Sequence, residues 1–197
     1  MNGGAPTDGT LQPAVDNAAT HVTSSTCWLR EPGPNDIDDI VAWLAQPTIG
    51  RWFDFGLGRQ TLTPLAVHAM VHSRQHRIRV FGSAGYTVPS GVVAVSDVTH
   101  RFATGSFWIL RDRSRPICAN MAYNAAIGLL HEAFMCDSLR CITAWAVDRN
   151  VPSLRLLTCL GFRLIGLQRD CHLVDGTCAG RLLYDLLPED LALPRAP

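Results

Sequence analysis

Lysine is absent from this chain of 197 residues, and glutamate is confined to Glu31, Glu132 and Glu189. The 17 strongly basic side chains are therefore all arginines, and 17 acidic side chains bring the formal net charge to zero. A neutral chain lacks the strongly basic surface that nucleic-acid binding requires. We therefore expect no nucleic-acid partner.

Long apolar runs are also missing, because no stretch approaches the roughly 20 residues that a membrane-spanning helix needs. The N-terminus has no basic start followed by an apolar core, so no secretory signal is recognisable. These absences predict a cytoplasmic protein that makes no membrane contact.

Cysteine is present at seven positions, but the number is odd and the spacing is irregular. In a reducing compartment such cysteines stay free and mostly act as small apolar side chains. Cys171, His172 and Cys178 lie close in the sequence, yet their spacing matches no zinc pattern and a fourth ligand is missing. We expect no metal site.

The composition describes one globular domain, since 47% of the residues are hydrophobic and 17% are charged. A chain of this length can bury a single core. Residues 1–25 are rich in Gly, Ala, Thr, Asn and Pro without periodicity, and we predict a disordered tail there. The folded domain is expected over residues 26–188, followed by a second tail at 189–197.

Apolar periodicity predicts strands and helices in an order typical of an α/β fold. Strands are expected at residues 27–31, 77–82, 91–98, 105–110, 141–147, 163–173 and 181–187. Helices are expected from Asn35 or Asp36 to about residue 46, and over residues 64–74 and 120–135. The last two strands should form a hairpin around Asp175 and Gly176.

The most specific stretch of the chain covers residues 140–162. Its strand stops at Asp148-Arg149-Asn150, and Pro152 then opens a short helix. Leucines give this helix an apolar face, and Gly161 can supply the left-handed residue that ends it. A strand, an Asn, a short helix and a Gly-Phe exit form a distinctive arrangement.

This stretch resembles the second half of the GCN5-related N-acetyltransferases. The matching positions are Asn150-x-x-Ser153, Leu160-Gly161-Phe162, Gly166 and Arg169. Phe134, Leu139-Arg140 and Asp175-Gly176 are similar to the branch that includes the ribosomal-protein alanine acetyltransferases. The resemblance covers about residues 29–187. It implies a mixed, largely antiparallel, twisted sheet with flanking helices, in which a bulged central strand diverges from its neighbour to leave a V-shaped split.

The resemblance also implies an activity: acetyl transfer from acetyl-CoA to a primary amine, by direct attack within a ternary complex. The acceptor would be a small molecule or a protein N-terminus, and the neutral charge and an aromatic loop favour a small molecule. Two alternatives stay open. One is a weak or inactive member that only binds, and the other is an enzyme that uses a longer acyl-CoA or an acyl-carrier donor. A homodimer is one arrangement open to such a protein.

In the resembled family, a loop patterned Arg/Gln-x-x-Gly-x-Gly/Ala holds the pyrophosphate of coenzyme A at a helix N-terminus. The corresponding positions here are residues 117–122, which makes Asn120, Met121 and Ala122 candidates for cofactor binding, although only Ala122 fits the pattern. Leu110 ends the preceding strand, and Arg111, Arg113 and Arg115 follow it with charge for the phosphates.

The resemblance assigns Asn150 to the pantetheine arm, although an Asn at this place can equally cap the helix. Many relatives carry a Tyr at the position of Leu157 that protonates the departing thiolate, which a leucine cannot do. Ser153 then becomes the candidate acid or the holder of a water, and its alternative role is a second capping hydroxyl.

Two residues are candidates for the general base. His172 lies on the late hairpin, and an unperturbed imidazole pKa near 6.5 suits a base at neutral pH. Asp97 lies near the end of the strand before the central one, where relatives often carry an acidic or water-holding residue.

The acceptor pocket is expected at residues 48–60, because in the resembled family the segment between the first two helices lines the acceptor side. Arg51, Trp52, Phe53 and Asp54 are the candidates for substrate binding. Aromatic clusters more often belong to a core than to a site, so these rings could equally be core residues with charges at the rim.

Overall fold

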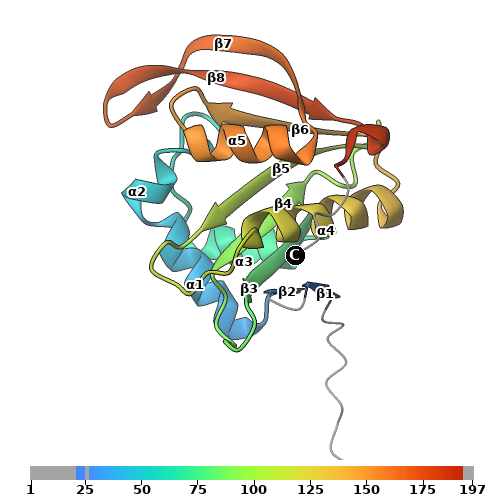
Figure 1. Cartoon of the computed structure of the whole chain (residues 1–197). Coiled ribbons are helices and arrows are strands. Elements are labelled where there is room, and N and C mark those ends of the chain that lie inside the picture. The colour runs from blue at the N-terminus through green and yellow to red at the C-terminus, as the bar shows by residue number, and fades with distance from the viewer. Residues whose placement is uncertain (1–20, 25–26, 193–197) are drawn as a thin grey trace, which may run out of the picture.

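The computed structural model describes residues 21–24 and 27–192, and these residues build an eight-stranded sheet in the order β1-β2-β3-β4-β5-β6-β8-β7 (Figure 1). The strands are β1 (His21–Ser24), β2 (Cys27–Arg30), β3 (His76–Ser83), β4 (Gly91–Ser96), β5 (Thr104–Arg111), β6 (Cys141–Val147), β7 (Arg163–Val174) and β8 (Thr177–Leu186). Every neighbouring pair is antiparallel except β5 and β6, which run parallel.

Helices cover both faces of this sheet. They are α1 (Pro34–Leu44), α2 (Pro47–Gly50), α3 (Pro64–His72), α4 (Met121–Cys136) and α5 (Val151–Leu160), with a 3₁₀ turn at Pro188–Asp190. Apolar side chains of α1 and α3 pack on one face of β3 and β4, while those of α4 pack on the other face. Within the described part of the chain, no helix has the length and hydropathy needed to cross a bilayer.

The start of α1 differs from the prediction. The capping position is Gly33, because Pro34, which has no N–H to satisfy, takes the first helical position. Asp36, expected as a cap, instead lies in the first turn and accepts the Gly33 N–H at 2.6 Å and an Arg30 N–H at 3.0 Å. The carboxylate therefore ties the helix start to β2.

The ends of the folded region also differ from the predicted boundaries at residues 25 and 188. His21–Ser24 is strand β1, because the edge of β2 supplies it with backbone partners, whereas residues 1–20 lie outside the described part. At the other end, Asp190 pairs with Arg163, and the Ala192 N–H donates to the Leu160 carbonyl at 3.1 Å. The predicted tail at 189–197 is therefore folded at least as far as residue 192.

Ion pairs attach α4 to the sheet. Glu132 accepts hydrogen bonds from both Arg77 and Arg79, and Asp137 accepts from Arg77 at 2.6 Å. The hydrogen bond to Asp137 raises the pKa of Arg77 further above its ordinary value. Glu132, one of the few glutamates of this chain, thus pairs with the half-buried Arg77 and the buried Arg79.

The V-shaped split expected from the sequence lies between β5 and β6. These strands pair only at Thr104–Cys141, Gly105–Ile142 and Ser106–Thr143. Beyond Ser106, β5 stays with β4 and β6 stays with β8, so the two strands diverge. The expected bulge is not seen, since β4 and β5 keep a single register along their whole ladder. Divergence of the strands therefore produces the split.

Gly161 gives a test of how α5 is held. Its φ of +95° is left-handed, and an added Cβ would lie 2.0 Å from the Asp190 carbonyl oxygen. Gly176 is a matched control, because its φ is +77° but an added Cβ would meet nothing within 4 Å. We expect Gly161→Ala to lower the free energy of unfolding by at least about 1 kcal/mol more than Gly176→Ala, since only the first adds a backbone clash to the left-handed strain. Urea denaturation measures both, and equal losses would contradict the packing of the C-terminal segment against α5.

Candidate active site

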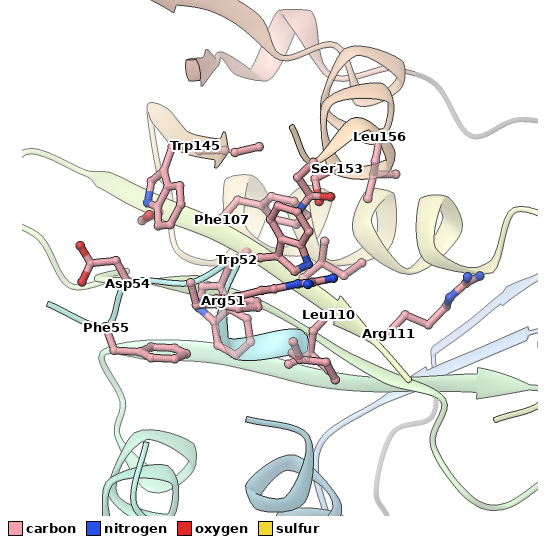
Figure 2. Close-up of a pocket in the computed structure, with 18 of the residues that line it drawn as sticks. Arg51, Trp52, Asp54, Phe55, Phe107, Leu110, Arg111, Trp145, Ser153 and Leu156 are labelled. Carbon is pink, nitrogen blue, oxygen red and sulfur yellow. The ribbon is translucent and has the colours of Figure 1, made fainter. Parts of the chain in front are cut away.

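A cleft of about 1000 Å³ passes through the split between β5 and β6 (Figure 2). On one side it is lined by the first turns of α5, and on the other by the segment that includes α2 and continues to Phe55. Residues 107–111 of β5 and residues 144–146 of β6 form the two remaining walls, between α5 and the segment around α2. The cleft therefore joins the two faces of the sheet.

Unpaired strand edges face each other across this cleft. Every second residue of β5 beyond Ser106 directs its N–H and C=O away from β4, towards the place where β6 has diverged. Such edges can bind an extended chain of amide groups by hydrogen bonds. Leu110, a predicted cofactor residue, lies on this part of β5 and lines the cleft.

The N-terminus of α5 presents polar side chains to the same cleft. Asn150 is the capping residue by position, but its side chain makes no capping hydrogen bond. Asn150 and Ser153 both line the cleft, as do Leu156 and the buried Leu157. The amide of Asn150 is therefore not committed to capping and can serve a ligand.

The N-terminus of α4 reaches the cleft through one of its three predicted residues. Ala122 lines the cleft, whereas Met121 is buried in the core at 2% exposure. Asn120 caps α4 in a left-handed conformation with φ of 56° and is exposed outside the lining. The positive end of the helix dipole therefore lies beside the cleft, with Ala122 at the point of closest approach.

The arginines after β5 fall into two groups. Arg115 binds Asp39 at 2.7 Å and lies 3.7 Å from Asp112, and it does not line the cleft. Arg111 and Arg113 do line it, both are exposed, and neither forms an ion pair with a described residue. Figure 2 shows Arg111 at one end of the lining. Two cations are thus left for an anionic ligand.

The predicted substrate residues Arg51, Trp52, Phe53 and Asp54 all line the cleft. Phe53 also stacks on Phe55 with ring centroids 5.4 Å apart and meets Trp108 edge-on at 6.1 Å. These rings pack against the core cluster under α1 and α3. Phe53 and Phe55 therefore line the cleft and pack against the core at the same time.

A hydrogen-bonded network fixes this segment to the β7–β8 hairpin. Arg181 donates to Asp54 at 2.7 Å and to Nδ1 of His172 at 2.9 Å, and Nε2 of His172 bonds to the Arg51 carbonyl at 2.8 Å. Burial would raise the pKa of Asp54, but the bonds from Arg181 and the N–H groups of Gly56 and Gly58 outweigh it, so that the pKa lies below its usual value.

His172, predicted as a base, belongs to this network. It is 5% exposed, and it lines a separate side cavity of about 300 Å³ instead of the main cleft. Its Nδ1 accepts from a guanidinium, so the ring is neutral and donates its Nε2 proton to the Arg51 carbonyl. This geometry suits a residue that positions the chain at residues 51–54.

Asp97 does line the cleft, and the structure brings it together with a residue that the sequence analysis missed. His76, the first residue of β3, lines the cleft near Asp97. Burial lowers the pKa of His76, and the charge of Asp97 raises it in part. The local sequence shows only a histidine at the start of a strand, so nothing in it marked this residue.

Comparisons with known proteins give a match only at the level of structure. No family model and no curated protein sequence matches the chain. A spermidine N-acetyltransferase from Vibrio cholerae, solved with CoA and spermine, matches with a TM-score of 0.72 and 16% identity, over 85% of this chain and 98% of that one. RimJ of Mycobacterium smegmatis, in complex with CoA-disulfide, gives 0.68 and 20% over 85% of each chain.

A ribosomal-protein-S5-alanine acetyltransferase from Vibrio fischeri gives a TM-score of 0.68 and 17% identity, over 89% of this chain and 100% of that one. At these identities the likeness concerns the fold, and it confirms the fold class expected from the sequence. The chain has the α/β fold of the GCN5-related N-acetyltransferases.

Proposed function

We propose that this protein transfers an acetyl group from acetyl-CoA to a primary amine, by direct attack within a ternary complex. One observation carries the proposal. The cleft crosses the sheet where two parallel strands diverge, so that a donor from one face and an acceptor from the other can meet inside it. Holding two reactants in this way removes much of the entropic cost of their encounter.

The residues of the cleft fit coenzyme A. The exposed edges of β5 and β6 suit the amide groups of the pantetheine arm. Phe107, Ile109 and Arg111 direct their backbone groups away from β4 on one edge, with Leu110 lining the cleft between them, and the free Asn150 amide lies beside the other edge. The dipole of α4 at Ala122 and the unpaired Arg111 and Arg113 suit the phosphates. Asn120 and Met121 would contribute to phosphate binding through their place at the start of α4. Arg115 would contribute only by stabilising the loop, because Asp39 already neutralises its charge.

Ser153 is the proposed partner of the departing sulfur. It lies in the first turn of α5 and lines the cleft, whereas Leu157, one turn further on, is apolar and buried. A hydroxyl can donate a proton or hold a water that does so. Acetyl-CoA supplies the thioester, and the chain supplies position, backbone hydrogen bonds and proton transfer.

The acceptor half of the cleft suits a small amine with an apolar body. Its lining there is mainly apolar: Ile49, Phe53, Phe55, Leu62, Met70 and Trp108. The charges of Arg51 and Asp54 are paired with Asp175 and Arg181. Some structural neighbours are named for polyamine or ribosomal-protein acetylation, so a protein N-terminus is the second acceptor to test.

One observation favours a different donor. Residues 117–122 have Ile117 and Asn120 where the family pattern has Arg/Gln and Gly, and a side chain at Asn120 limits close backbone approach to a pyrophosphate. A carrier-bound or longer acyl thioester would depend less on that loop for binding. A protein that binds a ligand without turnover would also tolerate the loss of the pattern.

The first test is calorimetric titration with coenzyme A. We expect Asn150→Ala to weaken binding by about twofold to tenfold, which is the range for one lost hydrogen bond. Asn35→Ala is the control, since Asn35 is exposed in α1 outside the cleft. If the wild-type protein bound no coenzyme A at millimolar concentrations, acetyl transfer from acetyl-CoA would be ruled out and carrier-bound donors would be tested next.

The phosphate contacts have a separate test. We expect Arg111→Gln and Arg113→Gln each to weaken coenzyme A binding by about threefold to tenfold, with a smaller effect at high ionic strength, because both guanidinium groups are exposed. Arg74→Gln provides a matched control on an exposed arginine outside the cleft. Unchanged affinity in both variants would show that the phosphates lie elsewhere.

A further inference from the structure

We propose that His76 accepts the proton that the acceptor amine must lose, and that it does so through the hydroxyl groups of Ser96 and Ser106. This inference rests on the proposed function, because it concerns a step of the same reaction. It assigns Asp97 the role of stabilising the charged imidazole.

The three residues form one row across neighbouring strands. His76 on β3 lies opposite Ser96 on β4, and Ser96 lies opposite Ser106 on β5. Directly opposite residues in antiparallel strands have their side chains on one face, with Cβ atoms about 4.5–5.5 Å apart. All three line the cleft.

The row begins at the apex of the split. Ser106 is the last residue of β5 that pairs with β6, so the hydroxyl stands where the two strands start to diverge. His76 stands two strands away, on the acceptor side of the sheet with Ile78 and Val80. A proton that leaves the split can therefore follow the row away from the thioester.

His76 has the properties of a proton acceptor. Its Nδ1 is buried and has no hydrogen-bond partner among the described residues, a state in which few buried polar atoms are left. Burial holds its pKa below 6.5, so the ring is neutral at physiological pH and free to take a proton. The nearby carboxylate of Asp97 then stabilises the imidazolium.

The surroundings of His76 contain few other charges. Its strand neighbour Arg77 binds Glu132 and Asp137 on the opposite face. On the face of the sheet that carries His76, the cleft lining includes Ser96 and Asp97 at the end of β4, Ser106, Trp108 and Leu110 of β5, and Ala66 and Met70 of α3. Asp97 is the charged group in this set.

The middle hydroxyl, on Ser96, accepts a hydrogen bond from Trp108. Trp108 donates its indole N–H to Ser96 Oγ at 3.0 Å. Ser96 Oγ therefore accepts on that side, and its own proton is left for another acceptor. A second lone pair of the same oxygen can accept from Ser106.

The proton balance requires such a route. An ammonium acceptor loses one proton to His76 and then to solvent, which frees the nitrogen lone pair to attack the thioester carbon. As the C–N bond forms and the C–S bond breaks, a second proton moves from the nitrogen to the departing sulfur. The products are the amide, the free thiol of coenzyme A and one released proton.

The test follows release of coenzyme A thiol from acetyl-CoA with a panel of primary amines, including phenylethylamine and a dipeptide, from acid to neutral pH. We expect wild-type kcat/KM to fall in acid with an apparent pKa below 6.5. His76→Gln should abolish this acid limb and lower kcat by about 10²-fold or more, the usual contribution of a general base. Coenzyme A affinity should stay unchanged.

Two further variants separate the base from its surroundings. Asp97→Asn should move the acid limb to lower pH, because the charge of Asp97 raises the pKa of His76. Ser106→Ala should lower kcat without moving the limb. His131→Gln is the control, since His131 is exposed on α4 outside the cleft, and it should leave the profile unchanged.

The inference is overturned if His76→Gln keeps the acid limb and the rate, or if Asp97→Asn moves the limb upwards. Failure of the wild-type protein to bind coenzyme A, or binding without thiol release above the blank, would instead overturn the proposed function itself.

Discussion

The divergence of β5 and β6 after three residue pairs is the feature on which the site depends. A sheet normally satisfies its backbone groups by pairing, so two strands that part inside a domain leave polar edges that need other partners. Here the edges face a cleft with the first turns of α5 on one side and the aromatic segment on the other. The same divergence therefore creates the cavity, lines it with hydrogen-bonding groups and opens it to both faces of the sheet.

Arginine holds the rest of the structure around this cleft. Arg77 and Arg79 attach α4, Arg115 attaches the loop before α4, and Arg181 joins the hairpin to Asp54. Guanidinium groups suit these half-buried positions because they bind carboxylates in a fixed, forked geometry that lysine does not offer. The absence of lysine fits this use. Arg111 and Arg113 differ because they line the cleft and form no ion pair with any residue that the structure describes.

Two histidines show why residue type alone does not assign a role. His172 lies beside residues 51–54, yet both of its ring nitrogens are engaged within the protein, so it serves to position those residues. His76 lies at the start of a strand, where nothing in the sequence marked it, and its Nδ1 is buried with no partner in the part of the chain that the structure describes. Strand register puts it in line with Ser96 and Ser106, residues 20 and 30 positions further along the chain.

The sequence by itself determined the local elements and the fold class. The short helix after Asn150, its end at Gly161 and the final hairpin follow from capping, apolar periodicity and turn residues, which act over a few neighbouring positions. The sequence also indicated that Asn150, Ser153 and the segment containing Phe53 would lie at the cleft, where the structure has them. Only the tertiary structure decided where β5 and β6 part, which arginines are paired and which histidine faces the cleft. These properties depend on contacts between residues far apart in the chain, and periodicity and local propensity carry no information about such contacts.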